Sequence, residues 1–221
     1  MTNDVYNMDC MEYMRTLPDK AFQLAIADPP YGVSYARGKN GYGVTVDKLP
    51  THDDVRWDDK IPDPTFFSQL LRVSENVIIW GANYYPQFLS HSMGWVVWDK
   101  GQHGLTMSDG ELAYTSFERA LRIVTINRGA IAQDGAIHPT QKPVALYAWL
   151  LKNYAKPGDR IFDPMMGSQS SRIAAYKLGF DYVGCELDKE YFDKGCERFN
   201  RECKGEIKTK DGHIIKQTTL W

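Results

Sequence analysis

The chain has few of the residues that assign a protein to a metal-binding or membrane class. Its 221 residues include four cysteines with no Cys-x-x-Cys pair, and its five histidines stand apart from them, so metal-ligand spacing is missing. We therefore expect no metal and a reducing compartment. The first residues lack a basic stretch followed by an apolar one, and no apolar run reaches the roughly 18 residues of a membrane span. We expect a cytoplasmic protein with no signal peptide and no membrane partner.

A strong positive charge is missing as well. Lysine and arginine total 26 against 28 aspartates and glutamates, which gives a formal net charge of -2 and no global field that would attract nucleic acid. Hydrophobic residues make up 43% of the chain and charged residues 24%, which is ordinary globular composition and argues against disorder. The length is enough for one domain with a real core, and we expect a single domain over residues 1–221.

Short apolar runs alternate with helical patterns along the chain. Strands are expected at residues 23–27, 76–80, 95–98, 121–126, 160–162 and 181–185. Helices are expected at 64–74, 143–154, 170–178 and 189–200, and an Asp-Gly pair predicts a hairpin over 207–215. Residues 32–64 and 128–137 interrupt the alternation and are expected to be loops. Strands that alternate with helices predict an α/β fold with a mostly parallel sheet.

The sequence Asp28-Pro29-Pro30-Tyr31 directly follows the first of these strands. Consecutive prolines cannot continue a central strand, so the strand must end there, at the edge where open α/β sheets bind ligands. The Asp28 carboxylate and the Pro29 carbonyl are expected to point outward beside the ring of Tyr31. Two acceptors beside a flat ring suit a planar group that carries an NH2. An ordinary Pro-Pro turn with an incidental tyrosine is the alternative.

Residues 160–186 form a pattern of strand, turn, helix, loop and strand, and the second strand ends on Glu186. In a nucleoside-binding βαβ unit, an acid at this place accepts hydrogen bonds from the ribose hydroxyls. Gly167 stands in the turn without the full G-x-G-x-x-G, so a nucleoside without a pyrophosphate fits better. The alternative for Glu186 is a solvated acid before a helix.

The sequence His138-Pro139-Thr140-Gln141-Lys142-Pro143 directly precedes an expected helix. A lysine beside a helix N-terminus opposes the helix dipole. Its position is explained if an anion such as a carboxylate docks between Lys142, the Thr140 hydroxyl and the open N–H groups of the helix. A proline-flanked turn with a solvated lysine is the alternative. For His138, a purely structural role is equally open.

Together the three motifs resemble the amino-methyltransferases of DNA, in the circularly permuted β class where DPPY precedes HPTQKP and D-P-x-x-G-S comes last. The order here is the same, and the resemblance covers most of the chain. It implies a Rossmann-like methyltransferase fold that uses S-adenosylmethionine, with a mostly parallel mixed sheet and helices on both faces. This cofactor is a nucleoside with a carboxylate and no phosphate, in agreement with the pattern at 160–186.

The resemblance also implies roles for the motif residues. The implied catalytic residues are Asp28, Pro29, Pro30 and Tyr31: Asp28 and Pro29 would bind the target amine, and Tyr31 would stack on a base flipped out of the duplex. The implied cofactor-binding residues are Asp9, Cys10, Asp28, His138, Thr140, Lys142, Asp163, Pro164, Gly167, Ser168 and Glu186. Asp9 and Cys10 would contact the adenine edge and Glu186 the ribose. Asp163, Gly167 and Ser168 would line the methionine part, and Thr140 and Lys142 would hold its end. The chain departs from the family at Gln169, which stands where glycine is usual.

An aspartate in the first position of DPPY usually accompanies adenine N6 and a serine cytosine N4, so we expect N6-methyladenine and keep cytosine N4 open. About a dozen residues separate position 126 from His138, so the recognition insert, at about 119–137, is minimal. We expect a short or relaxed recognition sequence and a mobile substrate loop at 32–64. Candidate DNA contacts are Arg37, Lys39, Arg119, Arg122 and Arg128.

Other functions remain open at this point. A methyltransferase of RNA or of protein glutamine reuses a related Pro-Pro-Tyr turn, although the glutamine enzymes usually have asparagine where this chain has Asp28. An inactive nucleic-acid-binding homologue is a further alternative. The expected partner is double-stranded DNA, with single-stranded DNA and a homodimer also open. Because basic residues are few, we expect DNA contact on one face around Tyr31 and a shallow salt dependence.

Overall fold

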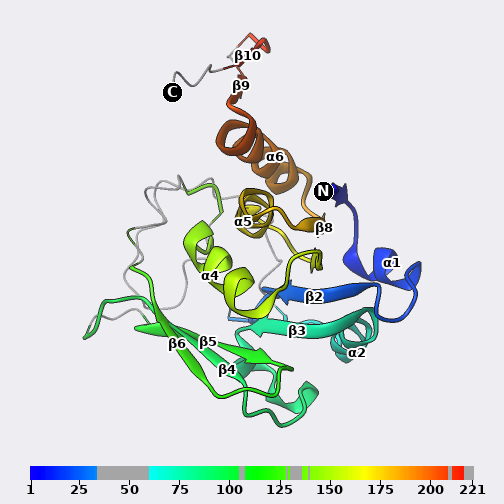
Figure 1. Ribbon diagram of the computed structural model, residues 1–221, viewed down its shortest axis with the longest axis vertical. Helices are drawn as coiled ribbons and strands as arrows, with labels where there is room; N and C mark the ends of the chain where they lie inside the picture. The colour runs from blue at the N-terminus through cyan, green and yellow to red at the C-terminus, as the bar shows by residue number, and fades with distance from the viewer. Residues whose placement is uncertain are drawn as a thin grey trace.

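A mixed sheet runs through the molecule (Figure 1). The computed structural model describes residues 1–33, 60–104, 108–127, 129, 136–138, 140–208 and 211–216. In spatial order the strands are β1 (Asn3–Asn7), β8 (Asp181–Glu186), β7 (Arg160–Asp163), β2 (Phe22–Ala27), β3 (Ser74–Trp80), β5 (Gly110–Thr115), β4 (Trp95–Asp99) and β6 (Arg122–Thr125). β5 is antiparallel to both of its neighbours, and the other pairs are parallel.

Helices cover both faces of the sheet (Figure 1). They are α1 (Cys10–Arg15), α2 (Pro64–Val73), α4 (Val144–Tyr154), α5 (Ser170–Leu178) and α6 (Lys189–Lys204), with short 3-10 turns η2 (Ala82–Tyr84) and η3 (Pro86–Phe88) after β3. Their starts follow local capping chemistry: Asp63 accepts the Thr65 N–H at 2.9 Å, and Asp188 accepts the Tyr191 N–H at 2.9 Å. No helix within the described ranges is long and apolar enough to cross a membrane.

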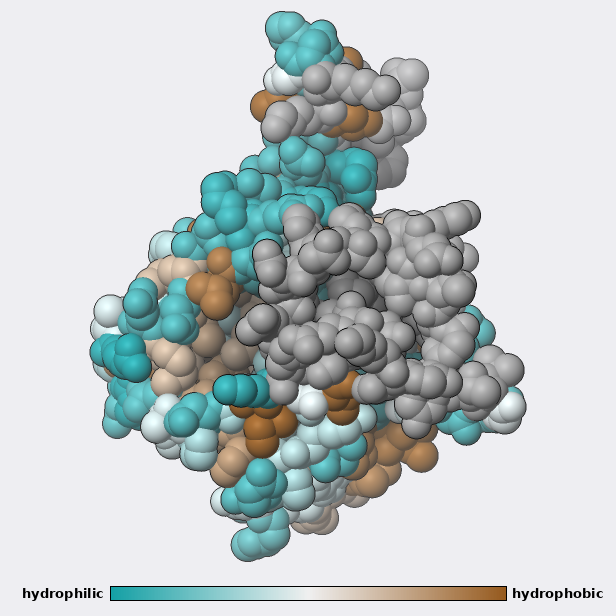
Figure 2. Space-filling view, turned by 180° about the vertical axis from the view of Figure 1, so that it is seen from behind, coloured by the Kyte–Doolittle hydropathy of each residue, from teal (hydrophilic) through white to brown (hydrophobic). Residues whose placement is uncertain are grey.

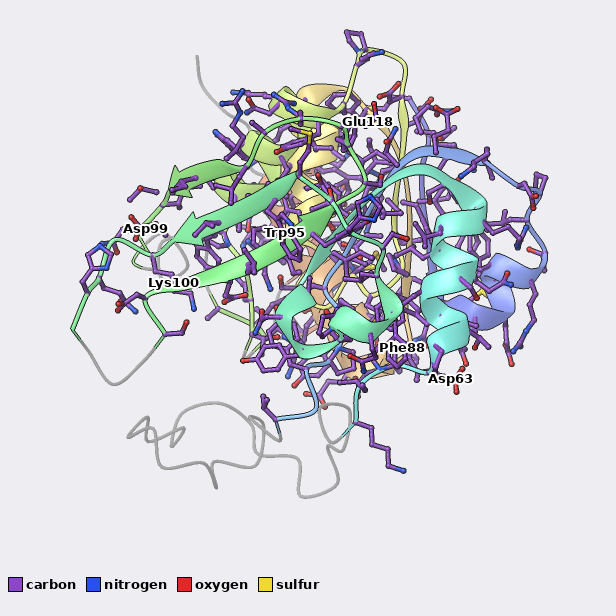
Figure 3. The ribbon with its side chains drawn as sticks, turned by 90° about the horizontal axis from the view of Figure 1, so that it is seen from below. Asp63, Phe88, Trp95, Asp99, Lys100 and Glu118 are labelled. Carbon is purple, nitrogen blue, oxygen red and sulfur yellow. The ribbon has the colours of Figure 1, made fainter. Side chains whose placement is uncertain are left out.

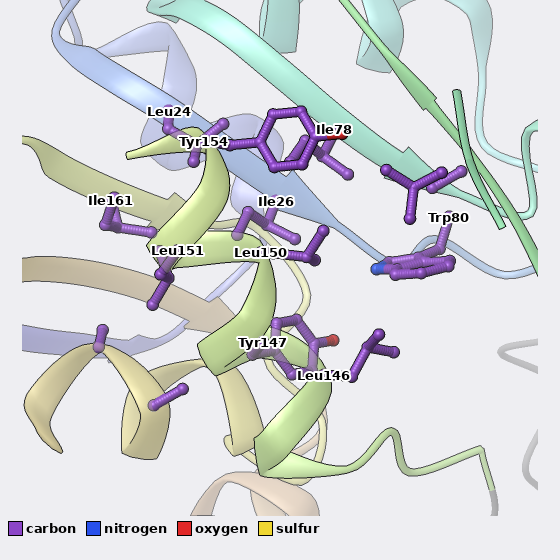
Figure 4. Packing of buried hydrophobic residues seen from close by; sticks show 14 of the residues in the cluster. Leu24, Ile26, Ile78, Trp80, Leu146, Tyr147, Leu150, Leu151, Tyr154 and Ile161 are labelled. Carbon is purple, nitrogen blue, oxygen red and sulfur yellow. The ribbon is translucent and has the colours of Figure 1, made fainter. Parts of the chain in front are cut away.

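Alternating side chains along the central strands build two apolar layers. Leu24 and Ile26 on β2 point to one face and pack with α4 and α5 (Figure 4). Ala25 and Ala27 point to the other face and pack with α1 and α2. This two-residue period is the geometry of a strand that is buried on both sides. The sheet is covered on both faces, and its strand pairing sets where the strand ends lie.

The expected α/β architecture is confirmed, with differences at the elements that carry little apolar pattern. β1 (NDVYN) and β5 (GELAYT) were not expected from the sequence, because β1 is polar and β5 opens with glycine and glutamate. α1 was missed because six residues are too few to establish a helical period. α6 continues to Lys204, four residues beyond the expected end, and Gly205 ends it at a φ of 66°.

The predicted hairpin at the end of the chain is confirmed. β9 (Glu206–Lys208) and β10 (Ile214–Lys216) pair antiparallel and stand beyond α6, away from the large sheet (Figure 1). Ile214 and Ile215 are exposed there and give the hairpin its apolar surface (Figure 2). The hairpin adds no residue to the edge of the sheet where the motifs meet.

The packing of α4 makes a first prediction. Leu150 is fully buried between α4 and the sheet (Figure 4), whereas Leu121 is 47% exposed. Leu150→Ala leaves a cavity and should lower the free energy of unfolding by about 3 kcal/mol, whereas Leu121→Ala should change it by less than about 1 kcal/mol. Urea denaturation of both variants measures the difference. Equal losses in the two variants would contradict the packing described.

Candidate active site

Segments far apart in the sequence meet at one edge of the sheet. β2, β7 and β8 are parallel neighbours, so their carboxyl ends bring together the turn at 28–31, the turn at 164–169 and Glu186. β5 runs the other way, and its register pairs Ala113 with Trp80, so its first residues lie at this same edge. The edge therefore holds every predicted motif, together with the start of a strand that the sequence did not reveal.

Asp28 is engaged on both of its oxygens. Oδ1 accepts the Tyr31 hydroxyl at 2.8 Å, and Oδ2 lies 2.5 Å from Nζ of Lys142. The Asp28 side chain is 18% exposed. The expectation that the Asp28 carboxylate points outward as a free acceptor is thus wrong, because the carboxylate faces the ammonium group of Lys142. Burial raises the pKa of Asp28, and Lys142 opposes that rise.

Lys142 is the centre of this arrangement. Its side chain is 3% exposed, and Nζ lies 3.1 Å from Oε2 of Glu111 as well as against Asp28. Nζ also donates to the Tyr31 hydroxyl oxygen at 3.2 Å. Burial lowers the pKa of Lys142, but the two carboxylates outweigh it and the pKa is raised. The anion expected beside this lysine is therefore supplied by the protein itself, in the form of two carboxylates.

Glu111, near the start of β5, is a site residue that sequence reasoning missed. Its Oε1 accepts Lys100, which directly follows β4, at 2.9 Å, and its Oε2 faces Lys142 (Figure 3 shows Lys100). Burial raises the pKa of Glu111, but Lys142 and Lys100 outweigh it and lower the pKa to about 2. No motif surrounds Glu111, and only the pairing of β5 with its neighbours brings it to this edge.

The Tyr31 ring lies between a glycine and a second tyrosine. Its centroid is 4.9 Å from that of Tyr84 at an interplanar angle of 13°, a stacked pair. On Gly81 an added Cβ would come within 2.1 Å of the Tyr31 ring, and the φ of Gly81 is +66°. Glycine is thus required there both by the backbone and by the ring. Tyr84 lies on η2 and was not predicted to be part of the site.

The turn after β7 is fixed from below by a buried acid. Oδ1 of Asp163 accepts the Met165 N–H at 3.0 Å, and Oδ2 accepts the Ser171 hydroxyl. Pro164 and Ser168 are buried in the same turn. Gly167 has a φ of +48°, and a Cβ there would lie 3.5 Å from the His138 ring. The predicted residues of this turn are together, with Asp163 beneath the turn and buried.

Gln169 stands where the resemblance leads one to expect glycine, and its side chain turns away from the edge. Its backbone is left-handed, with a φ of 59°. Its Nε2 donates to the Phe192 carbonyl at 3.1 Å, and its Oε1 accepts Arg172 at 2.8 Å. A Cβ on Gly195 of α6 would come within 2.6 Å of the Gln169 side chain. Gln169 can adopt this left-handed backbone conformation because the missing side chain of Gly195 leaves space for the glutamine side chain against α6.

Glu186 lies beside the same turn and joins it to the start of the chain. Its Oε2 accepts the Gly167 N–H at 2.8 Å, and its Oε1 accepts the Asp188 N–H at 2.9 Å. Its backbone carbonyl accepts the Met8 N–H at 3.1 Å, which places Asp9 and Cys10 next to it. A carboxylate has about four acceptor positions, so both oxygens can accept a further donor such as a ribose hydroxyl. These residues fit a nucleoside.

His138 and Thr140 form a local pair. Nδ1 of His138 lies 3.3 Å from the Thr140 N–H and 3.1 Å from the Thr140 hydroxyl, and the His138 ring lies against Tyr191 at 4.3 Å. Burial and then Lys142 lower the pKa of His138 to about 4, so the ring is neutral near pH 7. The structure thus pairs Thr140 with His138, and Lys142 with the carboxylates.

The sequence of the latter half of the chain matches a known family. Residues 95–197 match the family model described as DNA methylase, of the N6/N4 type. This range includes the turn at 138–143 and the βαβ unit at 160–186, whereas the turn at 28–31 precedes it. This part of the chain is therefore similar to DNA methylases of the N6/N4 type. The resemblance found in the motifs is confirmed, and the family uses S-adenosylmethionine.

Comparisons over the whole chain agree with this methylase assignment. The chain is 21% identical to the Type II methyltransferase M1.MboII of Moraxella bovis, over 87% of this chain and 94% of that protein. Its fold is similar to that of M1.HpyAVI in a complex with S-adenosylmethionine, with a TM-score of 0.58 and 18% identity over 88% of this chain and 98% of that protein. It is also similar to the cytosine-N4-specific PvuII DNA methyltransferase, with a TM-score of 0.56 and 13% identity over 94% of this chain and 95% of that protein. The expected methyltransferase fold is confirmed.

Two of the candidate DNA contacts, Arg119 and Arg122, do not lie at the edge where the motifs meet. Arg119 follows the end of β5, and Arg122 opens β6, so both lie at the opposite edge of the sheet from Tyr31. The Arg119 guanidinium also donates to the Asn153 carbonyl at 2.6 Å and lies over the Tyr154 ring. The other candidates, Arg37, Lys39 and Arg128, and most of the loop expected at 32–64 lie outside the described residues.

Asp163 makes the stability of the folded protein depend on pH. Burial raises its pKa from 3.8 to about 7, so the folded protein holds a proton there more tightly than the unfolded chain. Its contribution to stability is present below about pH 4 and is lost as the pH rises through about 7. Asp163→Asn removes this loss. The free energy of unfolding of the variant, relative to wild type, should rise by at least about 1 kcal/mol between pH 4.5 and pH 8.

Urea denaturation of both proteins across this pH range, without cofactor, measures the change. The comparison is a difference between two chains that share every other titrating group, so those groups largely cancel. A difference that stays constant with pH would show that Asp163 is ionised throughout.

Proposed function

We propose that this methylase transfers the methyl group of S-adenosylmethionine to the exocyclic amine of a base flipped out of DNA, with adenine N6 as the target. The observation that carries the proposal is the place of Asp28. Asp28 directly follows the central strand β2, which pairs with β7. Its carboxylate accepts the hydroxyl of Tyr31. An acceptor beside an aromatic ring at the cofactor edge is what an amine-binding site requires.

The proposed chemistry depends on how the amine is held. The lone pair of a base amine is delocalised into the ring, so the nitrogen is a poor nucleophile. If Asp28 and the Pro29 carbonyl accept its two hydrogens, the nitrogen becomes pyramidal and its lone pair is directed at the methyl group. S-adenosylmethionine would supply that methyl group on a positively charged sulfur: the nitrogen–carbon bond forms as the sulfur–carbon bond breaks, the neutral thioether leaves with that electron pair, and the nitrogen would lose one proton to the Asp28 carboxylate. The Tyr31 hydroxyl now on Oδ1 of Asp28 gives way to the amine.

The cofactor is proposed to lie across the ends of β1, β8 and β7. Glu186 would bind the ribose hydroxyls, and Asp9 with Cys10 would contact the adenine edge. Gly167 and Ser168 would follow the methionine part. Support comes from the acceptor capacity of Glu186 and from the bond between Met8 and Glu186 that joins the first strand to this place. Lys142 would act on the methionine end only by way of Asp28, because its ammonium faces the two carboxylates.

Cytosine N4 is the second candidate for the target. The similar PvuII methyltransferase is cytosine-N4-specific, so the fold is compatible with either amine. Asp28 favours adenine, since the resemblance associates aspartate in this position with N6. We propose a short or relaxed recognition sequence, because only a minimal insert is available before His138. The chain would act as a single domain on double-stranded DNA in the cytoplasm.

The target is tested by incubating the protein and cofactor separately with unmethylated duplex DNA, single-stranded DNA and RNA. Each polymer is then digested to nucleosides and analysed by mass spectrometry. We expect N6-methyladenine in duplex DNA. N4-methylcytosine would contradict the choice of base, methylation of RNA alone would contradict the choice of polymer, and no methylated nucleoside in any polymer would contradict the proposed activity.

Asp28→Ala tests the amine-binding role. We expect methyl transfer to fall at least about 100-fold, because the variant loses an acceptor that orients the amine. Cofactor affinity should change less than about threefold, since Glu111 still balances Lys142 and the ribose-binding end is untouched. Transfer is measured with tritiated cofactor and affinity by calorimetry. Asp4→Ala, an exposed aspartate on β1, is the matched control. An Asp28→Ala protein that keeps the wild-type rate would refute the role.

A further inference from the structure

Four charged groups and one hydroxyl form a continuous cluster at the motif edge. Lys100 contacts Glu111 at 2.9 Å, Glu111 contacts Lys142 at 3.1 Å, and Lys142 contacts Asp28 at 2.5 Å. These residues come from the end of β4, the start of β5, the turn before α4 and the end of β2. Two carboxylates and two ammonium groups balance one another in charge. We call this set the edge cluster: Asp28, Tyr31, Lys100, Glu111 and Lys142.

Tyr31 has two carboxylates within reach of its one hydroxyl proton. The hydroxyl lies 2.8 Å from Oδ1 of Asp28 and 3.2 Å from Oε2 of Glu111. It can donate to one of them at a time. At present the shorter contact is to Asp28, on the oxygen that the substrate amine would need. Glu111 is therefore the acceptor to which this hydroxyl can pass when the amine arrives.

Glu111 also shares Lys142 with Asp28. Without Glu111, the buried ammonium of Lys142 would keep its contact with Asp28 alone of these two carboxylates, and its charge would then be compensated mainly through Asp28. With Glu111 in place, the charge of Lys142 is divided between two carboxylates. Asp28 is then held in position by Lys142 on Oδ2, while Oδ1 is left for exchange between the Tyr31 hydroxyl and a substrate.

We propose that Glu111 is a positioning residue for methyl transfer: it accepts the Tyr31 hydroxyl and shares Lys142, and so releases one oxygen of Asp28 to the substrate amine. This inference rests on the proposed function of Asp28. Glu111 does not itself touch the reacting atoms. Its carboxylate acts through Tyr31 and Lys142, and Lys100 holds it from the side away from Asp28.

The cluster gives the proposal a pH signature. The groups that face Glu111 are Lys100 after β4, Lys142 before α4, and Asp28 and Tyr31 after β2, with the phenol of Tyr85 nearby. The negative charge of Glu111 raises the pKa of both Asp28 and Lys142. Glu111→Gln removes that charge and keeps the shape, so both pKa values should fall. The acid and alkaline limits of the kcat profile should both move to lower pH.

The test compares Glu111→Gln with Glu118→Gln. Glu118 is an exposed glutamate after the end of β5, well away from Lys100 (Figure 3). We expect Glu111→Gln to lower kcat at least about 10-fold with the KM for cofactor within about threefold, and to shift the pH profile as described. Glu118→Gln should leave both unchanged. Glu111→Asp keeps the charge, so it should give an intermediate kcat with an unshifted profile, and it serves if the glutamine variant does not fold.

A second arm isolates the hydroxyl. In a Tyr31→Phe background the competing proton is gone, so the kcat loss from Glu111→Gln should be at least about threefold smaller than in wild type. Any of three results would show that Glu111 has a merely structural role and would overturn the proposal. They are an equal kcat loss from Glu111→Gln in the wild-type and Tyr31→Phe backgrounds, an unshifted pH profile of Glu111→Gln, and a loss of activity that comes from a raised KM for cofactor. If wild type transfers no methyl group to any nucleic acid, the proposed function fails. If wild type is active and Glu111→Gln equals it, this inference alone fails.

Discussion

The buried ammonium of Lys142, held between Asp28 and Glu111, is the interaction on which the site depends. Removing one partner of a buried ion pair costs about 3–5 kcal/mol, because the remaining charge stays buried without compensation. Lys142 is compensated because both carboxylates lie at the same edge of the sheet. Their contacts with Lys142 connect the end of β2, the start of β5 and the turn before α4, which are distant in the sequence. The sheet makes this possible because it brings these segments to one place.

The cofactor side of the edge is organised by different means. Backbone N–H groups and the Ser171 hydroxyl, rather than ammonium groups, donate to the carboxyl groups of Glu186 and Asp163, so this part holds its acids without adding positive charge. Gln169 shows how far the sequence can vary here. Its left-handed backbone would suit glycine, and its side chain is accepted because Gly195 on α6 leaves room for it. The loss of one glycine in the turn is thus matched by another glycine in a neighbouring helix.

The sequence predicted the parts of the molecule that have a local pattern. The βαβ unit, the strand before Asp28 and the helix after Pro143 have apolar periods and punctuation that belong to the segment itself, and the structure agrees with them. β1 and β5 were missed because they owe their state to pairing with neighbours and not to their own composition. Glu111 was missed for the same reason, since its role depends on which strand lies beside it.

The partner of Lys142 shows the same limit. The sequence indicated that the lysine needs an anion, and it could not indicate that the anion is Asp28 from a motif more than a hundred residues earlier. Arg119 and Arg122 were expected to contact DNA because they are basic and lie in the minimal insert before His138, and the direction of β5 and β6 takes them to the opposite edge. Charge and residue type are local properties, whereas the edge on which a residue lies is set by topology.

Because Lys142 holds the carboxylate of Asp28, the two residues should act on the substrate amine as one unit. A double-mutant cycle on methyl transfer tests it most directly, with Asp28→Asn, Lys142→Met and the double variant compared with wild type. If the two residues act together, the double variant should be about as slow as the slower single variant, because the second change removes nothing that still works. If instead the two losses in rate multiply, Asp28 and Lys142 act independently, and Lys142 does not act through Asp28.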